Sequence, residues 1–104
     1  MRTTTSLSAA GSAPLIGGGE EGNIVAYQLT GTFSGTVTFE GSVDGTNYVA
    51  IAAEPIGGGS SVTTATAAGI WRVRAGGLHS VRARVSTYTS GTFVITQDVA
   101  DGTL

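Results

Sequence analysis

Hydrophobic and polar residues alternate with a period of two over most of the chain after residue 23. Such alternation is typical of β-strands with one buried face, and no segment has the 3.6-residue spacing of an amphipathic helix. Short segments rich in Val, Ile, Thr, Tyr or Phe, and bounded by Gly, Asn, Asp or Ser, are therefore predicted to be strands. They span residues 23–31, 35–42, 47–53, 69–75, 79–87 and 92–99, with a weaker candidate at 61–68.

Turn signals separate these segments. Asp44-Gly45 is a favoured hairpin dipeptide because glycine adopts positive φ without steric cost, and "TSGT" at 89–92 predicts a second tight turn. The stretch "EPIGGGSS" at 54–61 has no fixed turn type and predicts a loop. Roughly six to eight short strands with frequent turns predict an all-β fold, an antiparallel β-sandwich of jelly-roll or immunoglobulin-like type, in preference to a barrel.

Residues 1–23 consist largely of Thr, Ser, Ala and Gly and lack this periodicity. They are either an unstructured leader or an extended arm that becomes ordered on a partner, and the β-prone Thr3–Thr5 is compatible with an arm. We therefore divide the chain into an extended N-terminal arm, 1–23, and a β-sandwich domain, 24–104. Ordering a backbone costs about 1–2 kcal/mol per residue, so we expect this arm to be mobile in an isolated subunit.

Composition narrows the function classes. The 104 residues suit one domain, and a net charge of −2 without any lysine argues against a nucleic-acid partner. The absence of cysteine excludes disulfides and thiolate zinc sites. No apolar run is long enough for a membrane span, and the N-terminus makes a poor signal peptide. We expect synthesis in the cytoplasm and no membrane partner.

Four of the five basic residues lie in "WRVRAGGLHSVRARV" at 71–85, as Arg72, Arg74, Arg82 and Arg84. If the two halves of this stretch paired directly, Arg74 would face Arg82 and Arg72 would face Arg84, and like charges across a ladder destabilise it. Three arrangements avoid this cost. The face is solvated, carboxylates come to it, or the two strands lie in different sheets.

Pairing across the turn at Ser90-Gly91 would place Tyr88 opposite Phe93, on the same side as Arg82 and Arg84, unless a bulge exchanges the faces. Arginine mixed with aromatic residues is the composition enriched at protein–protein interfaces. The alternative is an ordinary solvated face, since arginines commonly cover sheet surface. The candidate interaction residues are Arg72, Arg74, Arg82, Arg84, Tyr88 and Phe93.

Residues that could carry chemistry are few. His79 is the only histidine and cannot form a multi-histidine metal site, and no nucleophile and orienting carboxylate accompany it in the local sequence. Asp44 lacks the alternating oxygen ligands of a calcium loop. Trp71 could stack on a sugar, but its alternation with Val and Ala favours a core position. The sequence predicts no enzyme, no catalytic residue, no cofactor and no metal site.

Two longer stretches, 29–51 and 68–95, carry a resemblance. In the first, "GTVTFEGSVDGT" forms a hairpin motif, and in the second "GIWRV" is followed by "GLHSVRARV". This order and spacing resembles that of small β-sandwich virion proteins of tailed bacteriophages and prophages, over residues 28–96. These are capsid decoration (cement) proteins or modules of tails and fibres.

The resemblance implies a structural protein of the virion. A decoration protein of this kind would sit as a homotrimer on the capsid surface and bridge subunits of the major capsid protein. An arm-like N-terminus and a separate gene product favour this hypothesis. The alternative is a tail- or fibre-associated module that binds a host glycan or protein.

Overall fold

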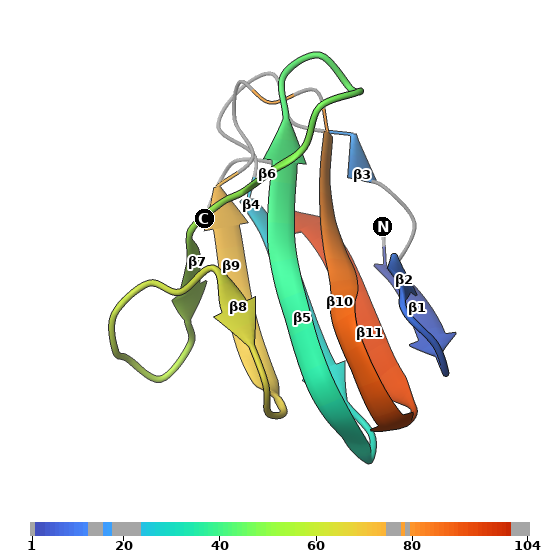
Figure 1. Ribbon diagram of the computed structural model, residues 1–104. Helices are drawn as coiled ribbons and strands as arrows, with labels where there is room; N and C mark the ends of the chain where they lie inside the picture. The colour runs from blue at the N-terminus through green and yellow to red at the C-terminus, as the bar shows by residue number, and fades with distance from the viewer. Residues whose placement is uncertain (1, 13–15, 18–23, 75–77, 79, 101–104) are drawn as a thin grey trace.

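The computed structural model describes residues 2–12, 16–17, 24–74, 78 and 80–100, and within these it contains strands in two antiparallel sheets and no helix (Figure 1). Neighbours in the first sheet follow the order β1 (Arg2–Leu7), β11 (Phe93–Ala100), β4 (Ile24–Thr30), β9 (Gly69–Arg74) and β7 (Ala53–Pro55). The second sheet has the order β2 (Gly11–Ser12), β10 (Ser80–Gly91), β5 (Phe33–Ser42) and β6 (Val49–Ala50). The short β3 (Ile16–Gly17) also pairs with β10, and β8 (Thr64–Ala65) pairs with β5.

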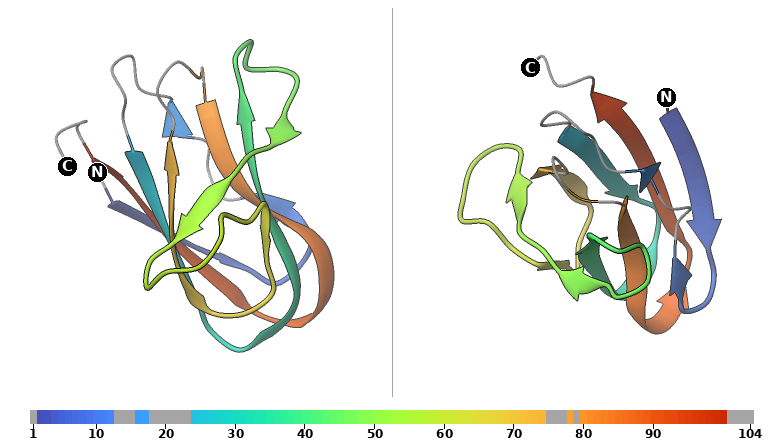
Figure 2. Two further views of the ribbon diagram at one scale, coloured as in Figure 1. Left: turned by 90° about the vertical axis from the view of Figure 1, so that its left-hand side faces the viewer. Right: turned by 90° about the horizontal axis from the view of Figure 1, so that it is seen from above.

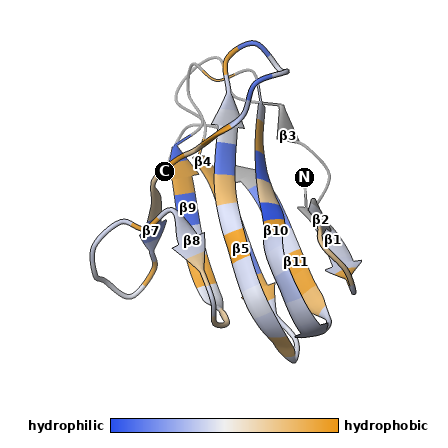
Figure 3. Cartoon of the chain, viewed as in Figure 1, coloured by the Kyte–Doolittle hydropathy of each residue, from blue (hydrophilic) through white to orange (hydrophobic). Residues whose placement is uncertain are grey.

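The apolar residues of the alternating pattern fill the space between the two sheets. Inward-facing apolar side chains from both sheets form one core, and along β9 and β10 apolar and polar bands alternate (Figure 3). Trp71 lies in this core beside Phe39, with 5.5 Å between ring centroids, which confirms its expected buried position. The buried apolar residues are Val25, Tyr27, Leu29, Val37, Phe39, Ala53, Ala65, Trp71, Val73, Val81, Ala83, Val85, Phe93 and Ile95.

A bent two-stranded ribbon joins the sheets. β4 and β11 pair in the first sheet, and their direct continuations, β5 and β10, pair in the second (Figure 2). The bend lies where Thr92 N donates to Thr32 O at 2.8 Å. Gly91 has φ +85° here, and a Cβ on it would lie 2.2 Å from Thr32 O, so this position requires glycine. The predicted turn at 89–92 is thus a corner between sheets.

Each predicted segment contains strand residues, although the weaker candidate at 61–68 contains only β8, and β7 extends into the predicted loop as far as Pro55. One segment is divided in a way that the periodicity did not show. The segment 47–53 contains β6, which pairs with β5, and the start of β7, which pairs with β9 in the other sheet. The chain therefore crosses between sheets around Ile51 and Ala52. The Asp44-Gly45 turn is present, with Gly45 at φ +79°, and Gly57, Gly58 and Gly59 in the predicted loop all have positive φ.

The described part of residues 1–23 adds strands to both sheets. Arg2–Leu7 pairs along its whole length with Asp98–Phe93, and the short β2 and β3 pair with β10. From this part of the chain, Leu7 packs against the core. The described residues of the segment expected to be an extended arm thus lie along their own sandwich, while the mobility of the segment in solution stays a prediction.

The prediction that β10 and β11 form a hairpin within one sheet is wrong, because the two strands lie in different sheets. Phe93 pairs with Leu7 of β1, and Tyr88 pairs with Gly35 of β5. The cause is the corner after Gly91, which sends β11 into the other sheet. Two register shifts in β10, between Val85 and Thr87 and between Tyr88 and Ser90, further change which side chains face inward.

Candidate interaction faces

The four clustered arginines are divided between the two sheets. Arg72 and Arg74 lie on β9 in the first sheet, whereas Arg82 and Arg84 lie on β10 in the second. The separation into different sheets, one of the three arrangements considered from sequence, is observed, so no two of these arginines face each other across a ladder. The connecting residues 75–77 and His79 lie outside the described residues.

Arg82 and Arg84 are bound to a carboxylate of their own chain. Arg82 lies opposite Glu40 in the β10–β5 register, and its Nε donates to Glu40 Oε1 at 2.7 Å. Arg84 donates to both oxygens, from Nε at 3.1 Å and from Nη2 at 3.0 Å. A bidentate, charge-assisted contact of this kind is among the stronger hydrogen bonds in proteins. A carboxylate therefore also comes to this face, from the neighbouring strand.

The ring of Tyr48 packs against the guanidinium group of Arg82. The Cζ of Arg82 lies 4.0 Å from the centre of the Tyr48 ring, a cation–π contact, and the Tyr48 hydroxyl is hydrogen-bonded to that of Ser80. We call Glu40, Arg82, Arg84 and Tyr48 the Glu40 cluster. Only 8% of the Glu40 side chain is exposed, against 25% for Arg82 and 38% for Arg84.

Electrostatics hold the cluster in its ionised form. Burial alone would raise the pKa of Glu40, but the hydrogen bonds and charges of Arg84 and Arg82 outweigh it and lower the pKa below its ordinary value. The hydrogen bond to Glu40 in turn raises the pKa of Arg84. The cluster has two cations and one carboxylate, and its members satisfy one another within the chain.

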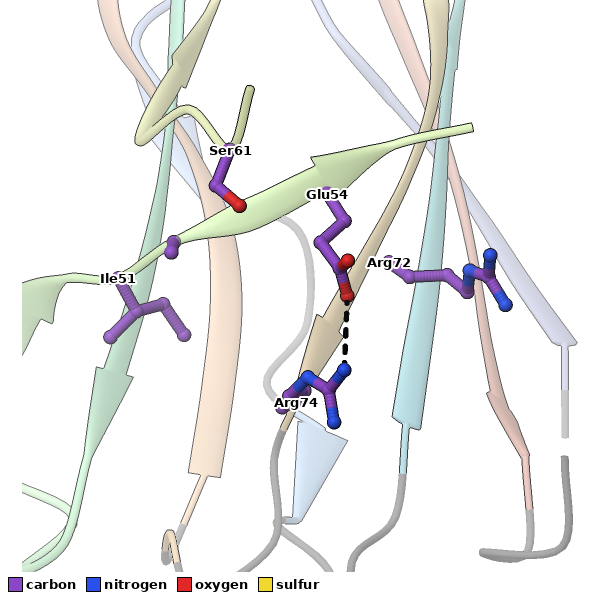
Figure 4. A pocket seen from close by; sticks show the side chains of 6 residues that line it. Ile51, Glu54, Ser61, Arg72 and Arg74 are labelled. Atoms are coloured by element: carbon purple, nitrogen blue, oxygen red, sulfur yellow. Dashed lines mark ion pairs between the residues drawn. The ribbon is translucent and has the colours of Figure 1, made fainter. Parts of the chain in front are cut away.

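The other two arginines are much more open. Arg72 and Arg74 lie on the outer face of the first sheet and line a shallow hollow of about 360 Å³ with Glu54 and Ser61 (Figure 4). Arg74 Nη2 lies 3.5 Å from Glu54 Oε1, and 81% of the Arg74 side chain is exposed. Arg72 stands opposite Glu54 in the ladder, yet it makes no ion pair with a described residue.

Tyr88 and Phe93 lie away from the arginines. Phe93 is 0% exposed and belongs to the core. Tyr88 packs against that core, with its ring centroid 6.1 Å from that of Phe93, and its hydroxyl donates to Gly91 O at 2.8 Å. The mixed face of arginines and aromatics expected from sequence is therefore not formed by these two residues, and Tyr48 is the aromatic partner of the arginines.

An apolar tip is a surface that the sequence reading missed. Val43 is 73% exposed and Val49 is 65% exposed. With Ile51 and Leu78 they border an open hollow of about 420 Å³ at the end of the β5–β6 connection. Val43 lies in the turn "SVDG". Turns are usually polar, so a β-branched apolar residue at this position was the feature of the sequence that could have indicated an exposed apolar surface.

The Asp44 turn is built for structure. Asp44 accepts hydrogen bonds from Ser42 Oγ, the backbone N–H groups of Thr46 and Asn47, and Asn47 Nδ2. The contacts from Asn47 and Thr46 lower the pKa of the Asp44 carboxyl well below its usual range. The groups that donate these hydrogen bonds to Asp44 thus all belong to its own turn. Among the described residues no three His, Cys, Asp or Glu side chains group as metal ligands would.

No helix of the described chain has the length and apolarity to span a bilayer. No protein-family model matches the sequence, and no curated protein matches it either. Among solved structures, the SPBc2 prophage-derived protein YomS shares the fold, with a TM-score of 0.69, 15% identity, and 96% of each chain covered. The PBSX exported protein XepA gives a TM-score of 0.68 at 15% identity.

The two matches differ in extent. The match to XepA covers 95% of this chain but only 38% of XepA, whereas YomS is matched over nearly its whole length. At 15% identity, these likenesses establish a shared fold. The same sandwich therefore accounts for nearly the whole of one prophage-derived protein and for a part of another.

Proposed function

We propose that this chain is a structural protein of a bacteriophage virion, and specifically a capsid decoration protein that binds the outer surface of the head and bridges major capsid subunits. The observation that supports it is the fold shared over 96% of both chains with a prophage-derived protein. The motif resemblance of residues 28–96 to phage β-sandwich proteins points to the same class. Fold alone does not fix function, so the surfaces carry the rest of the proposal.

The surfaces suit binding to protein. Arg72 and Arg74 present two exposed cations on an open face, at a hollow whose lining has one carboxylate, Glu54. Asp98 lies in the same outward row as Arg72, beyond Ala26. Such a face fits acidic side chains of a partner, because exposed guanidinium groups form bidentate contacts with carboxylates. The apolar tip at Val43 and Val49 gives a second, separate contact area. A homotrimer on the capsid surface would use one area between its subunits and another on the major capsid protein.

A second candidate is a binding module of a tail or fibre that recognises a host glycan or protein. XepA favours it, because there the same fold is part of a longer chain. Neither candidate uses catalysis, a metal or a cofactor, and neither requires nucleic acid or a membrane.

Counting copies in purified particles separates the two. Quantitative mass spectrometry of intact virions is expected to find this chain in amounts comparable with the major capsid protein. A few copies per particle would instead identify a tail component. Absence from particles that carry all other virion proteins would contradict both candidates.

A further inference from the structure

The edges of the two sheets are protected unequally. Unpaired edge strands are ready templates for another chain, and proteins usually shorten them or place Pro or charged residues on them. β6 has only two residues, and β2 and β3, which lie along β10, have two each. β7 has three residues and carries Glu54 and Pro55. Its Ala53 also exchanges two backbone hydrogen bonds with Val62, at 2.7 and 2.9 Å.

β1 has none of these protections. It is a six-residue strand, and its register with β11 runs from Arg2↔Asp98 to Leu7↔Phe93 without a bulge. After Arg2 it contains no charge and no proline. Among the described residues only β11 pairs with it, and it forms the outer rim of the molecule in the right-hand view of Figure 2. No described strand pairs with its other side, so β1 is the edge of this sheet in the part of the chain that the structure describes.

We propose that β1 is a self-association edge, at which the β1 strands of two copies pair antiparallel and join two five-stranded sheets into one continuous sheet. A two-fold axis perpendicular to the sheet keeps the outer faces of both copies on one side. Directly opposed residues must then face the same way, so the pairing is centred on Thr4 or on Thr5. Thr4 and Ser6 are exposed, whereas Thr5 and Leu7 are half-buried, which fixes these two alternating sets.

The chemistry of the strand fits a second copy of itself. An antiparallel two-fold places the two Arg2 positions at opposite ends of the pairing, so their charges do not meet. The middle of the strand brings Thr or Ser opposite Thr or Ser, a favourable cross-strand combination. Nothing on Thr3–Leu7 selects a charged partner strand, and two-fold pairing is the commonest symmetry of homo-oligomers.

This contact is independent of the proposed virion role. The two-fold contact joins two copies, whether each copy is a monomer or a subunit of a trimer formed through other surfaces. Within a decoration layer this contact would link one unit to the next. Its test measures self-association of the purified protein, and its failure would leave the particle-binding proposal standing.

The test uses Thr4→Lys combined with Ser6→Lys. A pairing centred on Thr4 would oppose the new lysines of the two copies at position 4 and would set the lysine at position 6 against Arg2. A pairing centred on Thr5 would set the lysine at position 4 against the one at position 6, so both registers oppose like charges. The matched control is Gln28→Lys with Thr30→Lys, two strands inward in the same two rows of the sheet. Sedimentation over a concentration series is expected to show association weakened about tenfold in the edge variant and unchanged in the control.

Covalent capture provides the second readout, because the chain has no cysteine. Mild oxidation of Thr4→Cys or Thr5→Cys should give a disulfide-linked pair much faster than oxidation of the control Gln28→Cys, whether or not the lysine variant folds well. Cysteine variants that crosslink no faster than Gln28→Cys would overturn the proposal. So would an edge lysine variant that is folded and associates like the wild type.

Discussion

Glu40 lies between two arginines on the outer face of the second sheet, with 8% of its side chain exposed. Its removal would leave Arg82 and Arg84 close together without a counterion. Hydrogen bonds to charged groups contribute about 1.5–3 kcal/mol, and the partial exposure of both arginines screens part of this. We expect Glu40→Gln to lower the free energy of unfolding by about 1–2 kcal/mol, measured in urea.

The control for this variant is Glu54→Gln. Glu54 makes the same type of ion pair, with Arg74, but both side chains are largely exposed. Surface pairs contribute about 0–1 kcal/mol, so the control should lose clearly less stability. Equal losses in the two variants would mean that the Glu40 cluster contributes no more than a surface pair.

The lowered pKa of Glu40 gives the cluster a pH dependence. A carboxyl whose pKa is lower in the folded state than in the unfolded state stabilises the fold above the unfolded value, about 4.3 for Glu. This stabilisation disappears as the pH falls through the folded-state pKa. The difference in unfolding free energy between wild type and Glu40→Gln should therefore be constant near neutral pH and shrink below about pH 4. A difference that persists unchanged in acid would show that Glu40 acts through packing.

At this scale the sequence indicated the direction of side chains but not their partners. Alternation in "GTVTFEGS" places Glu40 on the face opposite Val37 and Phe39. That it meets Arg82 depends on the pairing of β5 with β10, since the two residues are 42 positions apart in sequence. No local pattern encodes this pairing. The role of Tyr48 was missed for the same reason.

At the scale of elements, the ribbon bend at Thr32 and Gly91 determines which strands share a sheet. We expect Gly91→Ala to lower the free energy of unfolding by about 3 kcal/mol, because positive φ and a Cβ contact with Thr32 O at 2.2 Å both oppose it. Gly58→Ala is the control: Gly58 also has positive φ, at +103°, but open space around it. It should cost about 1 kcal/mol. Similar losses would show that the bend adapts to a side chain.

Strand positions could be predicted well and their sheet assignments could not. Alternation identifies a strand with one buried face in either sheet, and in a sandwich both sheets bury their inner faces against the same core. The turn residues at 89–92 fit a hairpin and a corner equally, so the sequence favoured the local pairing of Tyr88 with Phe93. The twelve-residue length of β10 and its two register shifts are set by pairing with β5.

The first residues show the same limit. Thr3–Thr5 has β propensity, but an edge strand that buries little leaves no alternation of apolar residues to detect. Hydrogen exchange of the protein, diluted until it is monomeric so that the proposed pairing of two β1 strands does not protect these amides, tests the expected mobility of this segment. Fast exchange of residues 2–7 would support it, whereas protection similar to that of β4 would show a stably paired strand.

On the scale of the whole molecule, the two outer faces differ in how far their arginines are exposed and how fully they are paired. The second sheet binds its arginines to Glu40, which is 8% exposed, while the carboxylate that pairs with Arg74 on the first sheet, Glu54, is 52% exposed. Asp98 lies in the same outward row as Arg72, but these two described residues form no ion pair with each other. The candidate for docking through arginine is therefore the first sheet. Arginine thus stabilises the fold on the outer face of the second sheet and is available to bind a partner on the outer face of the first.

Two double variants test this division, each replacing two arginines by serine. Arg72→Ser with Arg74→Ser should change the free energy of unfolding by less than about 1 kcal/mol, because both side chains are exposed. If the face docks on acidic side chains, the loss should weaken binding to particles by about 30-fold or more, since carboxylates of the partner would stay buried without counterions.

Arg82→Ser with Arg84→Ser should show the opposite profile. It leaves Glu40 nearly buried without a counterion, and we expect about 2 kcal/mol less stability, while particle binding at a temperature where the variant is folded should change little. Binding to purified particles at two salt concentrations, with thermal unfolding of each subunit, measures both effects. If neither pair affects binding, the arginines act only within the fold, and the apolar tip at Val43 and Val49 becomes the surface through which a partner would have to be bound.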